Sequence, residues 1–174
     1  MEELENVPAQ WEIKKLAEAV PDLRIRALFI FSYLTAGRVS EIVRKVQKKD
    51  INFIKVNDRD IMLIHMPNEK HRDRKYKDIP IPIDKEGELV SIVKSYLNGL
   101  GDEDILFPFS RKSAWKYLTK LGFKPHQMRK IRLTHLVTIY DLNEQLLIQY
   151  AGWTDSRPAK HYMQLKWKDL LQKL

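Results

Sequence analysis

Cysteine is absent from the 174-residue chain. Disulfides, thiol nucleophiles and cysteine-ligated zinc are therefore excluded, and nothing in the composition points to an oxidising compartment. Long apolar runs are scarce as well: the longest, 27–34, is interrupted by Ser32 and falls far short of the roughly 20 residues that a membrane-spanning helix needs. No secretory leader precedes it. The sequence therefore predicts a cytoplasmic protein without a membrane partner.

Metal-binding patterns are also missing. The five histidines do not have zinc-ligand spacing, and the H-E-x-x-H pattern does not occur, so we expect no bound metal. Acidic residues are the minority charge, since 23 Asp and Glu face 31 Lys and Arg and leave a formal net charge of +8. Such an excess favours a polyanionic partner such as DNA or RNA, although lysines spread evenly over a basic surface explain the charge equally well.

The chain is expected to form one domain. No internal repeat, low-complexity linker or composition break divides it, and 174 residues are enough for one domain with a core but too few for two of ordinary size. Helical spacing predicts a helix over 9–20 and a second one, capped by Asp22, to about Thr35. Gly37 is expected to end this helix, and 40–46 to form a short one.

A small antiparallel sheet is predicted in the middle of the chain. The segments 51–56 and 61–66 flank a turn signal, and 79–83 alternates with prolines, which places it at a sheet edge. The remaining pattern is helical, with segments at 86–100, 111–121, 125–141, 143–150, 159–163 and 166–174. We therefore predict an α+β fold that is mainly a helical bundle with a three-stranded antiparallel sheet.

Three short segments carry side chains suited to chemistry on a phosphodiester. The stretch 35–41, T-A-G-R-V-S-E, contains Arg38, and the stretch 126–129, H-Q-M-R, contains His126 and Arg129. The stretch 151–162 contains Trp153 and, nine residues later, Tyr162. Guanidinium groups bind two phosphate oxygens at once and stay charged. Residues three apart on a helix share a face, so His126 and Arg129 are able to converge on one phosphate.

Each of these residues also has a purely structural interpretation. Arg38 is placed to form an ion pair with Glu41 that only stabilises the loop. Arg129 fits a solvated basic run with Arg132, and Trp153 fits a position in the core. Taken one at a time, such residues occur by chance in most chains of this length, so their order and separations carry the signal.

In that order and at those separations, the segments resemble the active site of the tyrosine recombinase, or phage integrase, family. The resemblance spans nearly all of the chain and implies the catalytic-domain fold of that family. It implies that Tyr162 attacks a DNA phosphodiester and forms a 3′-phosphotyrosine, while Arg38 and Arg129 hold the phosphate. His126 is then the general base, and Glu41 orients Arg38.

Two positions depart from the family's usual pattern. Trp153 stands where the family most often has histidine; its indole N–H is able to donate to a phosphate oxygen but not to shuttle a proton. The family also uses a hairpin lysine to protonate the leaving 5′-oxygen. The loop 68–77 offers Lys70, Lys75 and Lys77, of which we favour Lys70 as the first after the second strand and keep Lys75 as the alternative. General phosphate contact is the structural interpretation of this loop.

The resemblance also implies partners. The chain is interpreted as a single catalytic domain over 1–174 without the family's N-terminal core-binding domain. Double-stranded DNA and other protomers are the expected partners. The protein is expected to be a tetramer on synapsed DNA and a monomer when free in solution, and to be associated with the nucleoid in the cytoplasm. The apolar stripe of the segment 165–174 fits packing either on its own domain or on a neighbouring protomer. Tyr162 is likewise free to act in its own site or in a neighbour's.

Three functions remain open at this point. The leading one is a site-specific DNA recombinase or integrase of a mobile element, which needs no metal or other cofactor because the phosphotyrosine ester keeps the energy of the broken bond. The second is a type IB topoisomerase activity with the same nucleophile and arginines. The third is a DNA-binding module without catalysis, against which the complete set of active-site residues argues.

Overall fold

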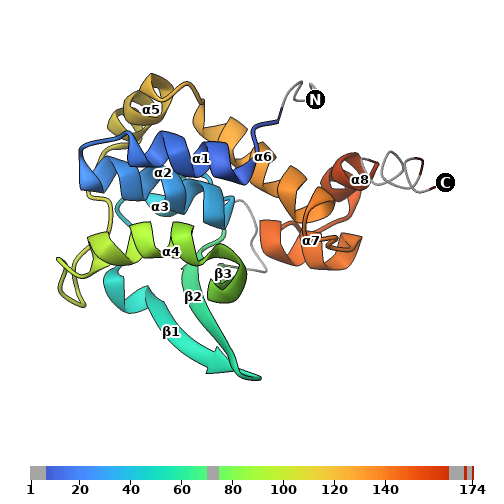
Figure 1. The fold of residues 1–174 in the computed structure, drawn as a ribbon, viewed down its shortest axis with the longest axis horizontal. Helices are drawn as coiled ribbons and strands as arrows, with labels where there is room; N and C mark the ends of the chain where they lie inside the picture. Colours follow the sequence, from blue (N-terminus) through green and yellow to red (C-terminus); the bar gives the residue numbers. More distant parts are fainter. Residues whose placement is uncertain (1–6, 70–74, 165–170, 172–173) are drawn as a thin grey trace.

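A computed structural model describes residues 7–69, 75–164, 171 and 174 of the chain. Lys70 and most of the segment 165–174 lie outside these residues. The described part combines helices with one small sheet, as predicted (Figure 1). In chain order the elements are α1 (Gln10–Glu18), α2 (Leu23–Thr35), α3 (Val39–Ile42), a 3-10 turn (Lys48–Asp50), β1 (Ile51–Val56), β2 (Arg59–Pro67), β3 (Tyr76–Pro82), α4 (Ile83–Leu97), α5 (Arg111–Lys120), α6 (Pro125–Thr138), α7 (Glu144–Ala151) and α8 (Arg157–Met163).

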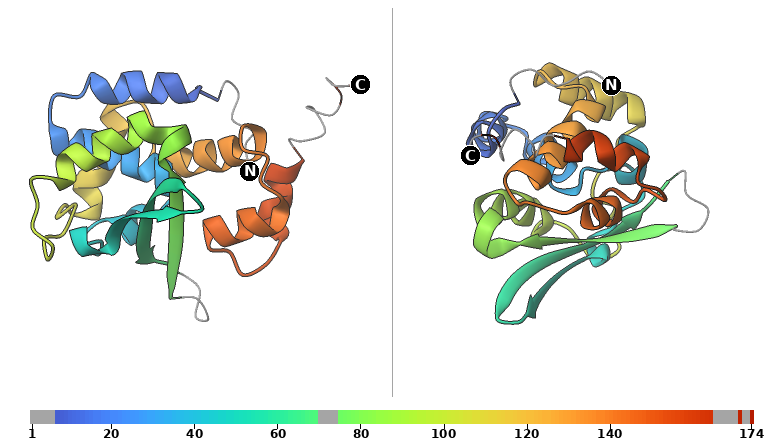
Figure 2. Two further views of the ribbon diagram at one scale, coloured as in Figure 1. Left: turned by 60° about the horizontal axis from the view of Figure 1, so that its bottom comes forward. Right: turned by 90° about the vertical axis from the view of Figure 1, so that its right-hand side faces the viewer.

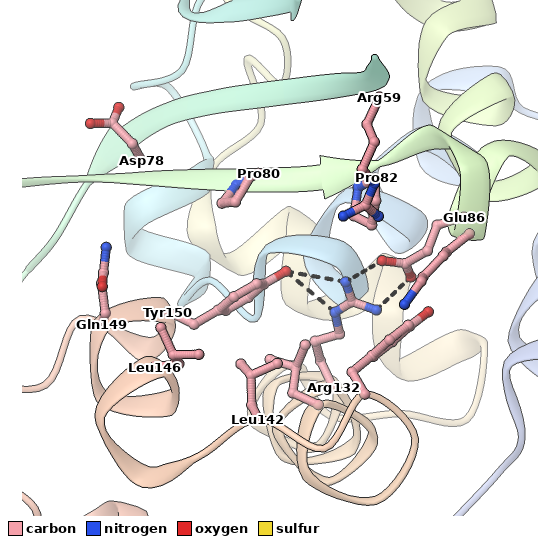
Figure 3. A pocket seen from close by; sticks show the side chains of 13 residues that line it. Arg59, Asp78, Pro80, Pro82, Glu86, Arg132, Leu142, Leu146, Gln149 and Tyr150 are labelled. Carbon is pink, nitrogen blue, oxygen red and sulfur yellow. Dashed lines mark hydrogen bonds and ion pairs between the residues drawn. The ribbon is translucent and has the colours of Figure 1, made fainter. Parts of the chain in front are cut away.

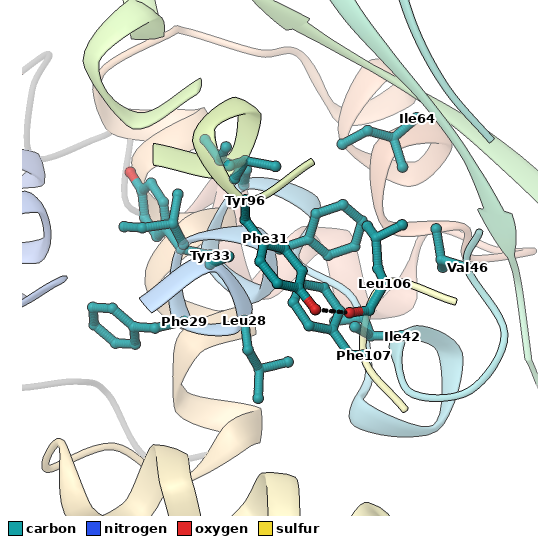
Figure 4. Packing of buried hydrophobic residues seen from close by; sticks show 14 of the residues in the cluster. Leu28, Phe29, Phe31, Tyr33, Ile42, Val46, Ile64, Tyr96, Leu106 and Phe107 are labelled. Carbon is teal, nitrogen blue, oxygen red and sulfur yellow. Dashed lines mark hydrogen bonds between the residues drawn. The ribbon is translucent and has the colours of Figure 1, made fainter. Parts of the chain in front are cut away.

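The helix α2 lies at the centre of the molecule. Asp22 caps it as predicted, because its carboxylate accepts hydrogen bonds from the backbone N–H groups of Arg24 and Ile25. Every residue from 27 to 35 is buried, which explains why this helix is apolar on all sides. It packs against α1, α4, α5 and α6, and aromatic rings of α2 and of the segment before α5 meet in the core (Figure 4).

The sheet has the strand order β1-β2-β3 and is antiparallel throughout. Alternate residues of β2 and β3 are buried under α4, which covers this face of the sheet (Figure 1). The edge position predicted for the third strand is confirmed. The strand itself begins earlier than predicted, since Tyr76 already pairs with Pro67, and Ile83 starts α4 instead of ending the strand.

The two predicted boundaries around α3 were wrong. The left-handed residue that ends α2 is Ala36, with φ 50°, and not Gly37. A Cβ at Gly37 would lie 2.9 Å from the Met66 Cε atom of β2 and 3.0 Å from two side-chain atoms of Ile42, so those side chains would have to shift. The following helix ends at Ile42 and not at 46, because Arg44 N donates to the Phe107 carbonyl and Val46 O accepts from Leu106 N. Partners distant in sequence thus replace the helical hydrogen bonds.

The C-terminal helices form a second apolar cluster. Side chains of α6, α7 and α8 pack together with Ala36, and α7 also contacts β3 (Figure 2). Trp153 and Tyr162 are both buried in this cluster. The last two helices therefore pack on the C-terminal half of α6, and α8 carries the candidate nucleophile, Tyr162, next to the helix that holds Arg129.

A buried ion pair anchors α6. The Arg132 guanidinium donates to both Glu86 carboxylate oxygens, at 2.6 and 2.7 Å (Figure 3). The rings of Tyr33, Tyr140 and Tyr150 surround it at 4.9 to 5.8 Å. Arg132 therefore belongs to the core and not to a solvated basic run. The pair joins α6 to the start of α4 and stabilises the orientation of the helix on which His126 and Arg129 lie.

Candidate active site

Arg38 lies in the loop between α2 and α3 and is held by Glu41. The Glu41 Oε1 atom accepts from the Arg38 backbone N–H at 2.8 Å, and Oε2 accepts from the Arg38 Nη1 atom at 3.3 Å. Glu41 is fully buried, whereas the Arg38 side chain is about a quarter exposed. The loop-stabilising ion pair is therefore present, and it also fixes the direction of a guanidinium that remains open to solvent.

Glu41 has two further partners, both from the ends of β2 and β3. Its Oε2 atom accepts from the Glu69 backbone N–H at 2.9 Å, and its Oε1 atom accepts from Lys77 Nζ at 3.2 Å. Burial lowers the pKa of Lys77 to about 8, a shift that the Glu41 carboxylate opposes and that Arg129 and Arg38 reinforce. One buried carboxylate thus joins the Arg38 loop to the hairpin.

Lys77 is the hairpin lysine that contacts Glu41, and the sequence interpretation considered it with Lys70 and Lys75 but did not select it. A signal was available, because Lys77 alternates with Ile79 and Ile81 and so faces inward on β3. Lys75, the alternative lysine, lines a separate cleft with Lys45 and other residues, and neither Arg38 nor Arg129 lines that cleft.

Arg129 is almost completely buried in the second turn of α6. Its Nη1 atom donates to Ala36 O at 2.6 Å, and its Nη2 atom donates to Ala151 O at 3.2 Å. Burial, with a smaller contribution from Arg38, lowers the pKa of Arg129 to about 10, so the group stays charged at neutral pH. The solvated-run interpretation of Arg129 is therefore wrong. This side chain connects the end of α2 to the end of α7.

His126 is exposed in the first turn of α6, directly after Pro125 at the first helical position. Burial and the nearby charges of Lys130 and Lys124 lower the pKa of His126 below its usual 6.5. The imidazole is therefore mainly neutral at pH 7, which is the state that accepts a proton.

Trp153 and Tyr162 stack on each other, with ring centroids 5.9 Å apart and an angle of 24° between the planes. The Arg129 guanidinium lies over the Trp153 ring at 5.6 Å. Burial raises the pKa of Tyr162, and the charge of Arg129 opposes this rise. Tyr162 thus lies near Arg129 of its own chain. Trp153 is part of the second apolar cluster, as its structural interpretation expected, and its ring also contacts the Arg129 guanidinium.

Three of the predicted site residues line one open cleft. Arg38, His126 and Arg129 all line it, and its volume is about 640 Å³. Three residues of α5 also line it, namely Arg111, Lys112 and Trp115, and Glu69 is the acidic residue of the lining. In the part of the chain that the structure describes, no cluster of His, Asp or Glu is arranged to hold a metal ion, and no helix is long and apolar enough to span a bilayer.

Comparisons with known proteins agree with this architecture at the level of structure alone. Neither the family sequence models nor the curated protein sequences match the chain. The XerA recombinase superposes with a TM-score of 0.63 at 18% identity, over 93% of this chain and 60% of its own. A XerH site-specific recombinase bound to its difH substrate before cleavage gives 0.61 at 15%, over 92% and 50%.

A lambda integrase dimer bound to a COC′ core site gives a TM-score of 0.58 at 17% identity, over 84% of this chain and 56% of that one. The chain thus spans between half and three fifths of these recombinases. It has the fold of a tyrosine recombinase catalytic domain, and the fold class predicted from the sequence is confirmed.

Proposed function

We propose that the chain is the catalytic domain of a site-specific DNA recombinase or integrase that cleaves and rejoins strands through Tyr162. The observation that carries this proposal is the convergence of Arg38, His126 and Arg129 on one cleft, with Tyr162 stacked on Trp153, whose ring also contacts the Arg129 guanidinium. The two arginines, the histidine and the tyrosine come from three separate segments, the α2–α3 loop, α6 and α8, and packing alone has no need of two arginines and a histidine around an open cleft. Such a set suits phosphodiester cleavage, because the arginines stabilise the charge that develops on the phosphate in the transition state.

In the proposed step, the scissile phosphate binds between Arg38 and Arg129. Their guanidinium groups neutralise the charge that builds on its oxygens, and Trp153 contributes its indole N–H. The Tyr162 hydroxyl attacks phosphorus and its proton passes to neutral His126, while the bond from phosphorus to the 5′-oxygen breaks. The leaving oxygen takes a proton from the hairpin lysine, for which Lys70 is the candidate.

The products are a 3′-phosphotyrosine and a free 5′-hydroxyl. Because the ester retains the energy of the broken backbone bond, attack by a 5′-hydroxyl reverses the step and rejoins the strand without ATP or a metal. The buried pair of Glu41 and Lys77 takes no proton in this scheme. Its role is to hold Arg38 and the hairpin in register.

The partners proposed for this activity are double-stranded DNA and further protomers that synapse two duplexes. The XerH and lambda integrase structures contain DNA, which supports the first partner. The excess of basic residues supports it as well, since a +8 chain attracts polyanions. A tetramer on synapsed DNA remains the expected assembly.

The test is covalent capture on nicked suicide duplexes, followed by denaturing gel and peptide mass spectrometry. Tyr162→Phe removes the nucleophile, and Tyr76→Phe is the matched control because Tyr76 is an exposed tyrosine on β3. We expect an adduct on the peptide that contains Tyr162 in the parent and in the control, and none in Tyr162→Phe. Binding without an adduct on any duplex would refute catalysis and leave a DNA-binding module.

Topoisomerase-like relaxation uses the same atoms, because it differs only in which 5′-hydroxyl rejoins the strand. Supercoiled plasmid distinguishes the two. Relaxed circles without crossover products indicate a type IB topoisomerase activity, whereas crossover products between two marked duplexes indicate recombination.

A further inference from the structure

A second pocket lies between the edge strand β3 and the helices α6 and α7 (Figure 3). Its volume is about 310 Å³, and none of the described residues lines both this pocket and the active-site cleft. We call it the β3–α7 pocket and define it by the following part of its lining: Pro80, Pro82, Lys85, Leu142, Leu146 and Tyr150. The reaction proposed above makes no use of these residues.

The buried charges in the lining of the β3–α7 pocket already have partners. Arg132 and Glu86 are joined by hydrogen bonds of 2.6 and 2.7 Å, and both side chains are 1% exposed (Figure 3). The Tyr150 hydroxyl accepts a further hydrogen bond from Arg132 Nη2 at 3.2 Å. A ligand that broke this pair would leave a buried charge uncompensated, at a large cost. A ligand therefore binds through the apolar part of the lining.

Apolar side chains of the lining remain partly in water. Leu146 is 50% exposed, and Leu142 and Tyr140 are half-buried. The buried residues of α7 are Leu147 and Ala151, so the packing of this helix in the core does not require Leu146. A concave site with mostly apolar walls and few polar groups is typical of small-molecule binding sites, whose volumes begin at roughly 300 Å³.

One cation at the rim of the pocket is available to a ligand. Arg59 is paired with Asp84 at 3.0 Å, and Asp78 Oδ1 lies 2.7 Å from His65 Nδ1. Lys85 forms no ion pair with any residue in the described ranges, and its Nζ atom lies over an aromatic ring of the lining, 5.8 Å from the ring centroid. An anionic group on an aromatic ligand would therefore find its partner in Lys85.

The size of the pocket and the chemistry of β3 decide what kind of ligand fits. A partner strand needs backbone N–H donors along the edge it joins, and Pro80 and Pro82 of β3 have none. A helix is about 10–12 Å wide with its side chains and is too large for this volume. A cavity of about 150 Å³ holds one benzene ring. The 310 Å³ of the β3–α7 pocket therefore suit a small molecule with two aromatic rings.

We propose that the β3–α7 pocket is a binding site for a small aromatic carboxylate. The rings contact Leu142, Leu146 and Tyr150, and the carboxylate pairs with Lys85. Such a ligand joins the start of α4 to α7. It leaves Arg132 in its pair and does not take part in the reaction at Tyr162, so this site goes beyond the proposed function.

The probe for this site is 2-naphthoate, and its binding is measured by isothermal titration calorimetry on the whole chain. A ligand of about 13 non-hydrogen atoms and ordinary efficiency has a Kd of about 1 mM. The neutral amide of the same shape, 2-naphthamide, should bind about 3-fold more weakly, because it loses the ion pair with Lys85. In Lys85→Gln the acid and the amide should bind equally.

Two leucine and isoleucine variants locate the probe. Leu146→Ala should weaken the binding of both the acid and the amide by about 5-fold, because apolar contact area is lost. The matched control is Ile139→Ala, since Ile139 is 52% exposed but does not line the pocket. It should leave both affinities unchanged. Leu146, Ile139 and Lys85 are all exposed, and thermal unfolding of each variant checks that the fold is retained.

The outcomes decide the proposal without any DNA. No measurable binding of 2-naphthoate, or the same affinity in Leu146→Ala as in Ile139→Ala, would overturn the site. Equal binding of the acid and the amide to the parent protein would overturn the carboxylate preference assigned to Lys85. Formation of the Tyr162 adduct is a separate measurement, so failure of either proposal leaves the other intact.

Discussion

Replacing Gly152 by alanine is expected to disturb the turn that carries Trp153. Gly152 ends α7 with φ 78°, in the left-handed region, and Asn68 of the hairpin packs against it. A Cβ at this position would lie 2.7 Å from Asn68 Cγ and 2.9 Å from Asn68 Nδ2, closer than atoms approach without displacement. Asn68 is itself buried, and its Nδ2 atom donates to Gly152 O at 3.0 Å.

Two costs combine in this variant. The left-handed conformation costs a residue with a Cβ about 1–2 kcal/mol. Moving Asn68 aside breaks its hydrogen bond and leaves a buried carbonyl unpaired, which costs about 1–3 kcal/mol more. The free energy of unfolding should therefore fall by roughly 2–5 kcal/mol, a large part of the 5–15 kcal/mol typical of a domain.

Gly122 provides the matched control. It also has a positive φ, of 99°, but a Cβ there would meet no atom within 4 Å. Gly122→Ala should therefore lose only the conformational part, about 1–2 kcal/mol. Urea denaturation measures both variants, and equal losses at the two glycines would refute the close packing of Asn68 on Gly152.

A double-mutant cycle isolates the contact itself. Asn68→Ala removes the obstructing side chain, so the double variant Asn68→Ala/Gly152→Ala should lose less stability than the sum of the two single variants, by about 1–3 kcal/mol. Strict additivity would contradict the clash. We also expect strand cleavage by Gly152→Ala to fall more than that by Gly122→Ala, because Trp153 and Tyr162 follow the displaced turn.

Three further predictions concern titration and charge. Burial lowers the pKa of Lys77 from 10.5 to about 8, so between these pH values the unfolded chain binds more protons than the folded one. The free energy of unfolding, measured by urea denaturation relative to Lys77→Met, should therefore rise by about 3 kcal/mol from pH 8 to pH 10.5. A difference between the two proteins that does not change with pH would count against the buried pair. On the acid side, the cleavage rate should fall below pH 6.5, where His126 gains its proton, and this acid limb should be absent from the pH profile of His126→Gln. Arg129→Lys should slow single-turnover cleavage on the order of 10²–10³-fold, since an ammonium lacks the planar fork that reaches Ala36 O and Ala151 O; an unchanged rate would remove Arg129 from the site.

Local signals in the sequence were sufficient for most elements of the fold. Asp22 and Asn143 cap α2 and α7 through their own side chains, and Pro125 starts α6. These interactions involve residues at most three positions apart, so the sequence displays them directly. The strands were predictable for a similar reason, since side chains alternate along each strand.

The errors arose where distant partners compete with local preference. The segment 40–46 has a helical pattern, yet it stops at Ile42 because Arg44 and Val46 bond to the segment before α5. The structural alternative of a solvated run that contains Arg129 and Arg132 fails for the same reason. Both side chains point into the domain, toward Ala151 O and Glu86, and no spacing rule reports those partners.

The sequence by itself determined which chemical groups are present and in what order: two arginines, a histidine, a tryptophan and a tyrosine at separations that resemble a recombinase site. It also determined the helices and strands that carry them. Only the tertiary structure decided that Lys77 faces Glu41, that Asn68 packs on Gly152 and that α5 lines the cleft. Those contacts join residues far apart in the chain, and they depend on how complete helices and strands pack, which no local pattern encodes.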